Sequence, residues 1–262
     1  MMYLPYELTH DTLPSIKFAE NNYHIPCTLV AMYLSLIVGG RKYMANRPAY
    51  SFKNQLILWN ISLSLFSFLG SIRMVPALMD HFTTATSTTD IICSPSIETW
   101  GTGPSGLWTQ LFIFSKIPEL FDTFFIVARK KPLLFLHWYH HVTVLLYCWH
   151  SYATQAPQTL PFITMNYMVH SIMYGYYGLS AMGQRPKWLD PSFITVAQIT
   201  QMFVGVVVQL FASYQYMTNE SCPVNRDNIL FGGIMYASYF ALFTQFAIKR
   251  YKIGYKVHKK LN

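Results

Sequence analysis

The sequence predicts an all-α integral membrane protein with seven transmembrane helices that enclose a tunnel. Three observations support this fold: the composition, seven long apolar stretches and the placement of the basic residues. Of 262 residues, 52% are hydrophobic and only 11% are charged, whereas soluble domains carry about 25% charged residues. No polar linker divides the chain. We therefore expect a single membrane domain over residues 1-262.

Each apolar stretch is long enough to cross a hydrocarbon core of about 30 Å. The expected spans are 24-41, 55-79, 106-128, 132-152, 158-182, 192-217 and 228-249. The first 22 residues lack the basic start and apolar core of a signal peptide, so insertion should begin with the first span. Seven spans place the two termini on opposite sides of the membrane.

The basic residues indicate which side each terminus occupies. Fifteen of the 19 lysines and arginines lie in the loops after spans one, three and five, or near the C-terminus. By the positive-inside rule these segments are cytosolic, and the N-terminus is lumenal. The net charge of +8 therefore indicates topology rather than nucleic-acid binding, because the basic residues do not follow one amphipathic face.

The C-terminal segment 250-262 is expected to be a basic cytosolic tail. Lys259 and Lys260 stand at the third and fourth positions from the end. This placement is similar to a dilysine signal for retrieval to the endoplasmic reticulum, although a merely basic tail is the alternative.

Two of the four cysteines fall in loops on the non-cytosolic side, where disulfides persist. Cys93 lies in loop 80-105 and Cys222 in loop 218-227, so we expect them to pair. Two unrelated thiols are the alternative. Cys27 and Cys148 fall inside spans and should be small buried apolar residues.

Ionisable residues inside the spans mark a candidate site, because each of them is costly in a bilayer. Counting about 1.5 Å per residue from the cytosolic ends places most of them in one layer, with Lys116 deeper. Such a pocket, polar towards the cytosol and apolar below, suits an amphiphile with a long alkyl tail. The residues are Lys116, Glu119, Asp122, His137, His140, His141, Asn166, His170, Tyr174, Tyr176, Tyr177, Gln198 and Gln201.

The individual residues allow several interpretations. His137, His140 and His141 occupy positions i, i+3 and i+4 of one helix face, which fits metal binding, acid–base or nucleophilic chemistry, or hydrogen bonding within a bundle. Lys116 and Glu119 can neutralise each other, whereas Asp122 has no partner in its own helix and should contact a histidine of the fourth span. The tyrosines could be interfacial residues, and the glutamines could bridge helices.

Four motifs together resemble those of the ELO family of fatty acid elongases, over nearly the whole chain. They are Lys116-x-x-Glu119-x-x-Asp122-Thr123, His137-x-x-His140-His141, His170-x-x-Met173-Tyr174-x-Tyr176-Tyr177 and Thr195-x-x-Gln198-x-x-Gln201. The run FLHWYHH and the pair Asn166-Tyr167 look most like the branch that acts on saturated and monounsaturated acyl chains. Phe121 stands where that branch has a smaller residue.

This resemblance implies a very-long-chain 3-oxoacyl-CoA synthase, an acyltransferase of the endoplasmic reticulum membrane. Such an enzyme condenses a long-chain acyl-CoA with malonyl-CoA, releases CO2 and CoA, and yields a 3-oxoacyl-CoA two carbons longer. No bound cofactor or metal is expected. The bilayer, the other enzymes of the microsomal elongation cycle, and a homo- or hetero-oligomer are the implied partners.

We expect His140 to accept the acyl group, since a neutral imidazole can attack without prior activation. His141, His170 or Asn166 would stabilise the enolate of malonyl-CoA, and Asp122 or Glu119 would orient an imidazole ring. A direct condensation in a ternary complex is the mechanistic alternative. The CoA phosphates should lie near basic residues at the cytosolic mouth, among them Arg129, Lys130, Lys131, Arg185, Lys187, Lys249 and Arg250.

Two other classes of protein share features with this sequence. A di-iron membrane desaturase or hydroxylase also uses H-x-x-H-H boxes, but it needs several of them, and this chain has one. A non-enzymatic seven-helix receptor or transporter fits the number of helices, but it leaves the layer of histidines unexplained.

Overall fold

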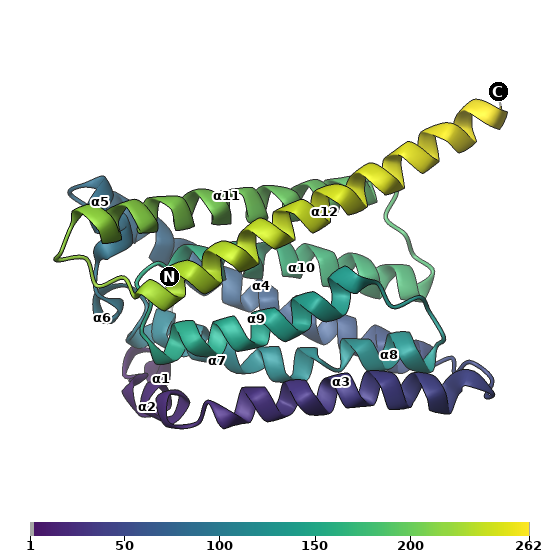
Figure 1. Cartoon of the computed structure of the whole chain (residues 1–262), viewed down its shortest axis with the longest axis horizontal. Coiled ribbons are helices and arrows are strands. Elements are labelled where there is room, and N and C mark those ends of the chain that lie inside the picture. Colours follow the sequence, from purple (N-terminus) through teal and green to yellow (C-terminus); the bar gives the residue numbers. More distant parts are fainter. Residues whose placement is uncertain (1–2, 262) are drawn as a thin grey trace.

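The computed structural model describes residues 3–261, with side chains from residue 3 to residue 250. Within these residues the chain forms twelve helices, and Asp11 and Thr102 make an isolated β-bridge. The helices of the bundle lie side by side along the long axis of the molecule (Figure 1). They are α3 (His24–Ala45), α4 (Lys53–Thr84), α7 (Gly103–Glu119), α8 (Asp122–Ala128), α9 (Phe135–Ala153), α10 (Thr159–Met182), α11 (Pro191–Thr218) and α12 (Arg226–Leu261).

The all-helical fold predicted from the sequence is confirmed, and the long helices fall on the seven predicted ranges. Four helices are long and apolar enough to cross a membrane: α3, α4, α11 and residues Arg226–Arg250 of α12. The remaining ranges correspond to α7 with α8, to α9 and to α10, which carry most of the polar motif residues. α7 and α8 are each too short to cross a membrane alone, and polar residues lower the hydropathy of α9 and α10.

The third predicted range, 106-128, is not one continuous helix. The helix breaks at Leu120 and Phe121, whose amides donate to the carbonyls of Ile117 and Pro118, three residues back. Pro118 lies just before the break and has no amide hydrogen, so the last turn of α7 lacks one helical hydrogen bond. As a result, Glu119 ends α7 whereas Asp122 begins α8, and the two carboxylates belong to different helices.

The two ends of the bundle differ. One end, here called the basic end, carries the loops 46–52, 129–134 and 183–190 with their lysines and arginines. The opposite end, called the disulfide end, is covered by short helices at the left of Figure 1. They are α1 (Pro5–Leu8), α2 (Leu13–Asn21), α5 (Thr88–Cys93) and α6 (Ser96–Thr99).

The N-terminal residues are anchored at the disulfide end through Glu7, which is 1% exposed. Arg73 of α4 donates two hydrogen bonds to the Glu7 carboxylate, at 2.8 and 3.0 Å, and Trp108 Nε1 of α7 donates a third at 3.0 Å. The hydrogen bonds from Arg73 are the main reason why the pKa of Glu7 is lowered to about 2. This contact could not be predicted from the sequence, because Glu7 and Arg73 are 66 residues apart.

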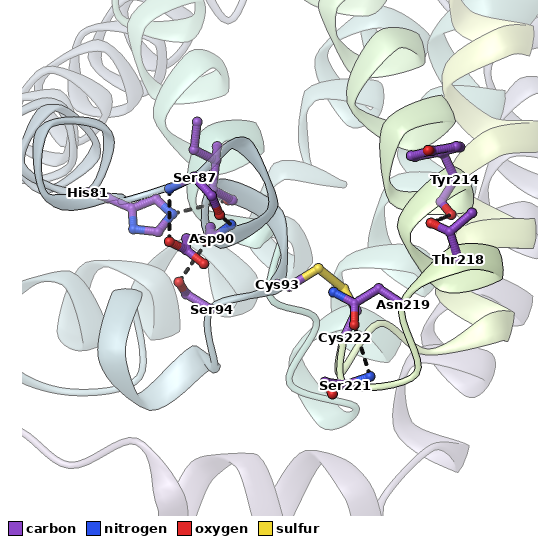
Figure 2. The surroundings of a disulfide bond; sticks show 11 residues. His81, Ser87, Asp90, Cys93, Ser94, Tyr214, Thr218, Asn219, Ser221 and Cys222 are labelled. Carbon is purple, nitrogen blue, oxygen red and sulfur yellow. Dashed lines mark hydrogen bonds between the residues drawn. A yellow bond between two sulfur atoms is a disulfide. The ribbon is translucent and has the colours of Figure 1, made fainter.

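Cys93 and Cys222 form a disulfide at this end, with their Cα atoms 4.8 Å apart, as the sequence led us to expect (Figure 2). Cys93 ends α5, and Cys222 lies in the loop between α11 and α12. A capping box starts α5: Asp90 N donates to Ser87 Oγ, and Ser87 N donates to the Asp90 carboxylate. The bond therefore ties the chain that follows α4 to the chain that precedes α12.

Two large buried clusters lie towards the disulfide end, and a smaller one of Ile92, Ala212, Cys222 and Val224 surrounds the disulfide. The first cluster joins α2, α4, α7, α9 and α10 around Trp100, Trp149 and Tyr167. The second cluster joins α9, α10, α11 and α12, and consists of Tyr147, Phe162, Met202, Met235, Tyr236 and Tyr239. The second cluster reaches the site through Met202, and the rest of the site lies nearer the basic end.

Candidate functional site

A pocket of about 430 Å³ lies between α4, α8, α9, α10, α11 and α12. Arg129 and Lys131, from the loop between α8 and α9, lie in its wall and place it at the basic end. Most of the site residues predicted from the sequence line this pocket. They are Asp122, Arg129, Lys131, His137, His140, His141, Asn166, His170, Tyr174, Tyr177, Gln198 and Gln201.

The three histidines of α9 form a continuous group. The ring of His141 lies 4.5 Å from the His137 ring and 5.4 Å from the His140 ring, measured between centroids. His141 Nε2 lies 3.9 Å from Asp122 Oδ2, and His141 is 5% exposed. This is the contact between Asp122 and a histidine of the fourth span that the sequence predicts.

Asp122 also accepts two hydrogen bonds from other helices. Trp59 Nε1 of α4 donates to Oδ1 at 2.5 Å, and Tyr174 Oη of α10 donates to Oδ2 at 2.7 Å. Two donors and a neighbouring imidazole fix the carboxylate in one orientation. Trp59 could not be identified from the sequence, since a single tryptophan in an apolar helix carries no signal of its own.

His137 is held on the side of the pocket nearest α3. Thr123 Oγ1 lies 3.0 Å from His137 Nε2, and Tyr33 Oη of α3 lies 2.7 Å from the same hydroxyl. Tyr33 is 5% exposed and was also missed. The chain Tyr33–Thr123–His137 restrains the ring, so that His137 and His141 face α3 and α8.

His140 faces the other way, towards α12. Its ring lies 5.2 Å from the ring of Tyr239, whose hydroxyl donates to the His140 carbonyl at 3.1 Å. On α10, Asn166 Nδ2 donates to His170 Nε2 at 3.3 Å. Asn166 Oδ1 is buried and has no hydrogen-bond partner among the described residues, so it is available to a group that enters the pocket.

Lys116 and Glu119 do not line the pocket. Lys116 Nζ donates to Glu119 Oε1 at 2.7 Å and lies 4.0 Å from the centre of the Phe112 ring, and both charged side chains are buried. Ser115 Oγ donates to the same carboxylate oxygen at 2.9 Å. Lys116 and Glu119 therefore neutralise each other, which is one of the interpretations drawn from the sequence. They do so on the side of α7 that packs in the first cluster.

The three consecutive basic residues after α8 have different environments. Lys130 has φ of 53°, and its Nζ donates to the carbonyls of Ala45 at 3.0 Å and Arg47 at 2.9 Å. It thereby ties two loops together and turns away from the pocket that Arg129 and Lys131 line. The left-handed backbone at Lys130 lets its side chain point away from those of Arg129 and Lys131.

The remaining predicted residues lie apart from the pocket wall. Tyr176 packs beside Leu63 and Tyr174, and Arg185, Lys187, Lys249 and Arg250 are exposed. Lys259 and Lys260 lie outside the residues whose side chains are described. Within the described part of the chain, no three His, Cys, Asp or Glu side chains are grouped so that they could hold a metal ion.

Comparison with known proteins gives a consistent result. The ELO family, described as the GNS1/SUR4 family, matches residues 18–259. The chain is 43% identical over 223 residues to very long chain fatty acid elongase 6 of Drosophila melanogaster, covering 84% of this chain and 70% of that protein. It is 38% identical over 238 residues to the Homo sapiens protein of the same name, covering 90% and 88%. It is 36% identical over 252 residues to very long chain fatty acid elongase 3 of Homo sapiens, covering 95% and 91%. The sequence motifs, the pocket and these relatives lead to one conclusion, that this chain belongs to the ELO family.

Proposed function

We propose that this protein is a fatty acid elongase that condenses a long-chain acyl-CoA with malonyl-CoA. The observation that carries the proposal is one pocket that gathers four imidazoles and a carboxylate from three helices, beside Arg129 and Lys131. The relatives named very long chain fatty acid elongases support the same reaction. The product is a 3-oxoacyl-CoA two carbons longer, and the enzyme uses no bound cofactor.

The proposed setting is the endoplasmic reticulum membrane, crossed seven times with the N-terminus in the lumen. The disulfide at one end and the basic loops at the other support this orientation, because disulfides persist in the lumen and basic loops remain in the cytosol. The basic end and the mouth of the pocket then face the cytosol. Other enzymes of the elongation cycle would reduce and dehydrate the product.

In the first step, the unprotonated ring nitrogen of His140 attacks the thioester carbonyl of the acyl-CoA. The carbon–sulfur bond breaks, the CoA thiolate leaves, and the proton on the other ring nitrogen passes to it. This gives CoASH and a neutral acyl-imidazole on His140. His140 lines the pocket rather than the outer surface of the bundle, which limits the access of water to this intermediate.

In the second step, malonyl-CoA loses CO2, and the electron pair of the broken carbon–carbon bond forms an enolate. Asn166 Nδ2 and the His170 ring lie in the pocket wall and can donate to the enolate oxygen. The enolate carbon then attacks the acyl carbonyl, and the bond to His140 breaks. The imidazolide that leaves takes up one proton from water, which restores the neutral ring of His140.

Asp122 acts through His141 rather than on the substrate in this proposal. Its Oδ2 faces His141 Nε2, while Trp59 and Tyr174 hold the carboxylate in place. This arrangement sets the tautomer and orientation of His141, next to the ring that carries the acyl group.

The proposed reaction is tested by supplying radiolabelled malonyl-CoA and defined saturated acyl-CoAs to membranes that contain the protein. A labelled 3-oxoacyl-CoA two carbons longer is expected, and membranes with His140→Gln protein should produce none. His150→Gln is the matched control, because His150 lies on the same helix outside the pocket wall. Failure of the wild-type protein to form product with any acyl-CoA would contradict the proposal.

The covalent step is tested separately by mass spectrometry of the purified protein. After incubation with acyl-CoA alone, His140 should gain the mass of the acyl group, and malonyl-CoA should remove it. An active enzyme that never shows this increment would instead support direct condensation in a ternary complex.

A further inference from the structure

One polar side chain in the pocket wall has no part in the reaction steps described above. Asn60 of α4 lines the pocket, is 5% exposed, and belongs to none of the four motifs. A polar group inside a membrane-spanning helix is costly, and polar residues that face the interior of a bundle mark functional sites. Asn60 therefore needs a role that the proposed reaction steps do not give it.

The side-chain amide of Asn60 uses only its donor half within the protein. Nδ2 donates to the carbonyl of Leu56, four residues earlier in α4, at 2.7 Å. This contact fixes the orientation of the amide, because only the nitrogen can donate to a carbonyl. Oδ1 lies on the other side of the amide and accepts no hydrogen bond from the described residues. The pocket thus presents a free acceptor at Asn60, which suits a ligand that carries an N–H group.

Asn60 lies between the imidazoles and the basic end. It packs against α10 at Gly178, where an added Cβ atom would lie 3.6 Å from Asn60 Cβ. Gly178 follows His170 by eight residues, so it lies about 12 Å closer to the basic end. On α4, Asn60 lies seven residues, or about 10 Å, from Lys53 at the start of the helix. The free acceptor therefore faces the part of the pocket that connects its mouth to His170.

The proposed substrates place a peptide-like arm in this part of the pocket. The phosphates of CoA lie at the basic end and the thioester of malonyl-CoA lies at His170, so the pantetheine arm joins the two. In an extended arm, the amide N–H nearer the phosphates lies about 10 Å from the thioester carbon. This reach is similar to the rise of about 12 Å from His170 to Gly178. A buried N–H group without an acceptor is costly, so tight binding requires an acceptor at this level.

We propose that Asn60 is a CoA-binding residue whose Oδ1 accepts a hydrogen bond from the pantetheine amide nearer the phosphates. This inference rests on the proposed elongase function and names a further substrate contact in the same pocket. Acyl-CoA and malonyl-CoA both carry this arm, so they use the same acceptor in turn. The arm is remote from the reacting atoms and makes the contact before and during the reaction. Its loss therefore changes the KM of both substrates rather than kcat.

The first test measures KM for the two substrates separately. Asn60→Ala removes the acceptor and should raise KM for acyl-CoA and for malonyl-CoA by about 5-fold each, with kcat close to that of the wild type. Ser64→Ala is the matched control, because Ser64 lies one turn further along α4 and does not line the pocket. Its Oγ donates to the Ser171 carbonyl at 2.7 Å, so this variant also removes a polar contact between α4 and α10. Ser64→Ala should keep both KM values.

The second test needs no turnover and separates the arm of CoA from its nucleotide. The Kd values of CoA and of adenosine bisphosphate, the nucleotide end of CoA without the arm, are measured by titration calorimetry on the purified proteins. Asn60→Ala should weaken the binding of CoA by about 5-fold and leave that of adenosine bisphosphate unchanged. Asn60→Leu, which fills the side-chain space without an acceptor, takes its place in this comparison if Asn60→Ala does not fold.

The third test identifies the hydrogen bond itself, with a CoA analogue in which an ester oxygen replaces the N–H nearer the phosphates. The wild type should bind this analogue about 5-fold more weakly than CoA. Asn60→Ala should bind the analogue and CoA alike, because the acceptor is already missing. The control analogue carries the ester at the other amide, and its affinity relative to CoA should be the same in both proteins.

The outcomes separate this inference from the proposed function. Unchanged KM values and an unchanged Kd of CoA in Asn60→Ala would overturn the contact. Equal weakening of CoA and adenosine bisphosphate would also overturn it, since the substitution would then damage the pocket in general. In either case, a wild type that forms 3-oxoacyl-CoA leaves the elongase proposal intact. A wild type that forms no product, but binds CoA with an affinity that depends on Asn60, would contradict the elongase function and support the contact.

Discussion

Trp59 Nε1 donates a 2.5 Å hydrogen bond to Asp122 Oδ1, and this contact joins α4 to the start of α8 behind the histidines. Trp59 belongs to none of the four sequence motifs. Its indole is one of two donors that hold the carboxylate beside His141, so it is a positioning residue for the proposed reaction.

Replacing Trp59 by Phe removes the donor and keeps an aromatic ring. We expect kcat to fall about 10-fold, because one hydrogen bond to a charged group is worth about 1.5–3 kcal/mol. KM for acyl-CoA should stay close to the wild-type value, since the indole does not line the pocket.

The matched control is Trp108→Phe, which removes a hydrogen bond to another carboxylate, that of Glu7 at the disulfide end. It should lower the Tm without changing kcat. Equal losses of kcat in the two variants would show that Trp59 acts only through general stability.

The pair of Lys116 and Glu119 should matter for stability more than for substrate binding. The two charges are buried and 2.7 Å apart, and neither lines the pocket. Lys116→Met alone leaves a buried carboxylate without its partner, so it should destabilise the protein by about 3–5 kcal/mol.

The double variant Lys116→Met/Glu119→Gln should recover most of that loss, because no buried charge is left unpaired. Thermal unfolding of the single and double variants in detergent measures the coupling between the two residues. A double variant that regains stability but has no condensation activity would show that the pair also serves the reaction.

The hydrogen bonds of Glu7 make one part of the stability depend on pH. Its pKa is lowered from 4.5 to about 2 in the folded protein, chiefly by Arg73. A lowered pKa means that the stabilisation is complete above pH 4.5 and disappears as the pH falls towards 2. Glu7→Gln should therefore lower the Tm at pH 7, and its difference from the wild type should shrink between pH 4.5 and pH 2.

Asp90 provides the control for this experiment, because its side chain is half-buried and its carboxylate makes only local hydrogen bonds, with Thr86 and Ser87 at the start of α5. Asp90→Asn should change the Tm much less at pH 7. A Tm difference for Glu7→Gln that does not vary with pH would contradict the assigned role of the Arg73 contact.

The helices and most of the polar residues that line the pocket could be predicted from the sequence, for a physical reason that His140 and Asp122 illustrate. Both are polar groups in apolar stretches, and their cost in a bilayer makes them stand out. Distance from the loops then places them at one depth, because a helix rises by a constant 1.5 Å per residue.

What the sequence could not predict depends on the direction of individual side chains. Lys130 and Lys131 are neighbours of the same type, yet only Lys131 lines the pocket, because Lys130 adopts φ of 53°. Trp59 and Tyr33 belong to the site through contacts across 63 and 90 residues, and neither is unusual in an apolar helix. The break after Pro118 likewise separates Glu119 from Asp122, although their spacing of three residues predicts a shared helix face.

The difference between Lys130 and Lys131 gives a direct test of where CoA binds. Arg129 and Lys131 lie in the pocket wall at the basic end, so they are placed to contact CoA phosphates. Lys131→Gln should raise KM for acyl-CoA about 10-fold with little change in kcat, since a charge-assisted hydrogen bond is lost equally from the ground state and the transition state.

Lys130→Gln is the matched control: it removes the same charge one residue away, but breaks the hydrogen bonds to Ala45 and Arg47. It should lower the Tm and leave KM unchanged. Raising the salt concentration should narrow the KM difference between the wild type and Lys131→Gln, because salt screens exposed charges. Equal increases of KM in both variants would mean that the basic end attracts CoA by its total charge, without a defined phosphate site.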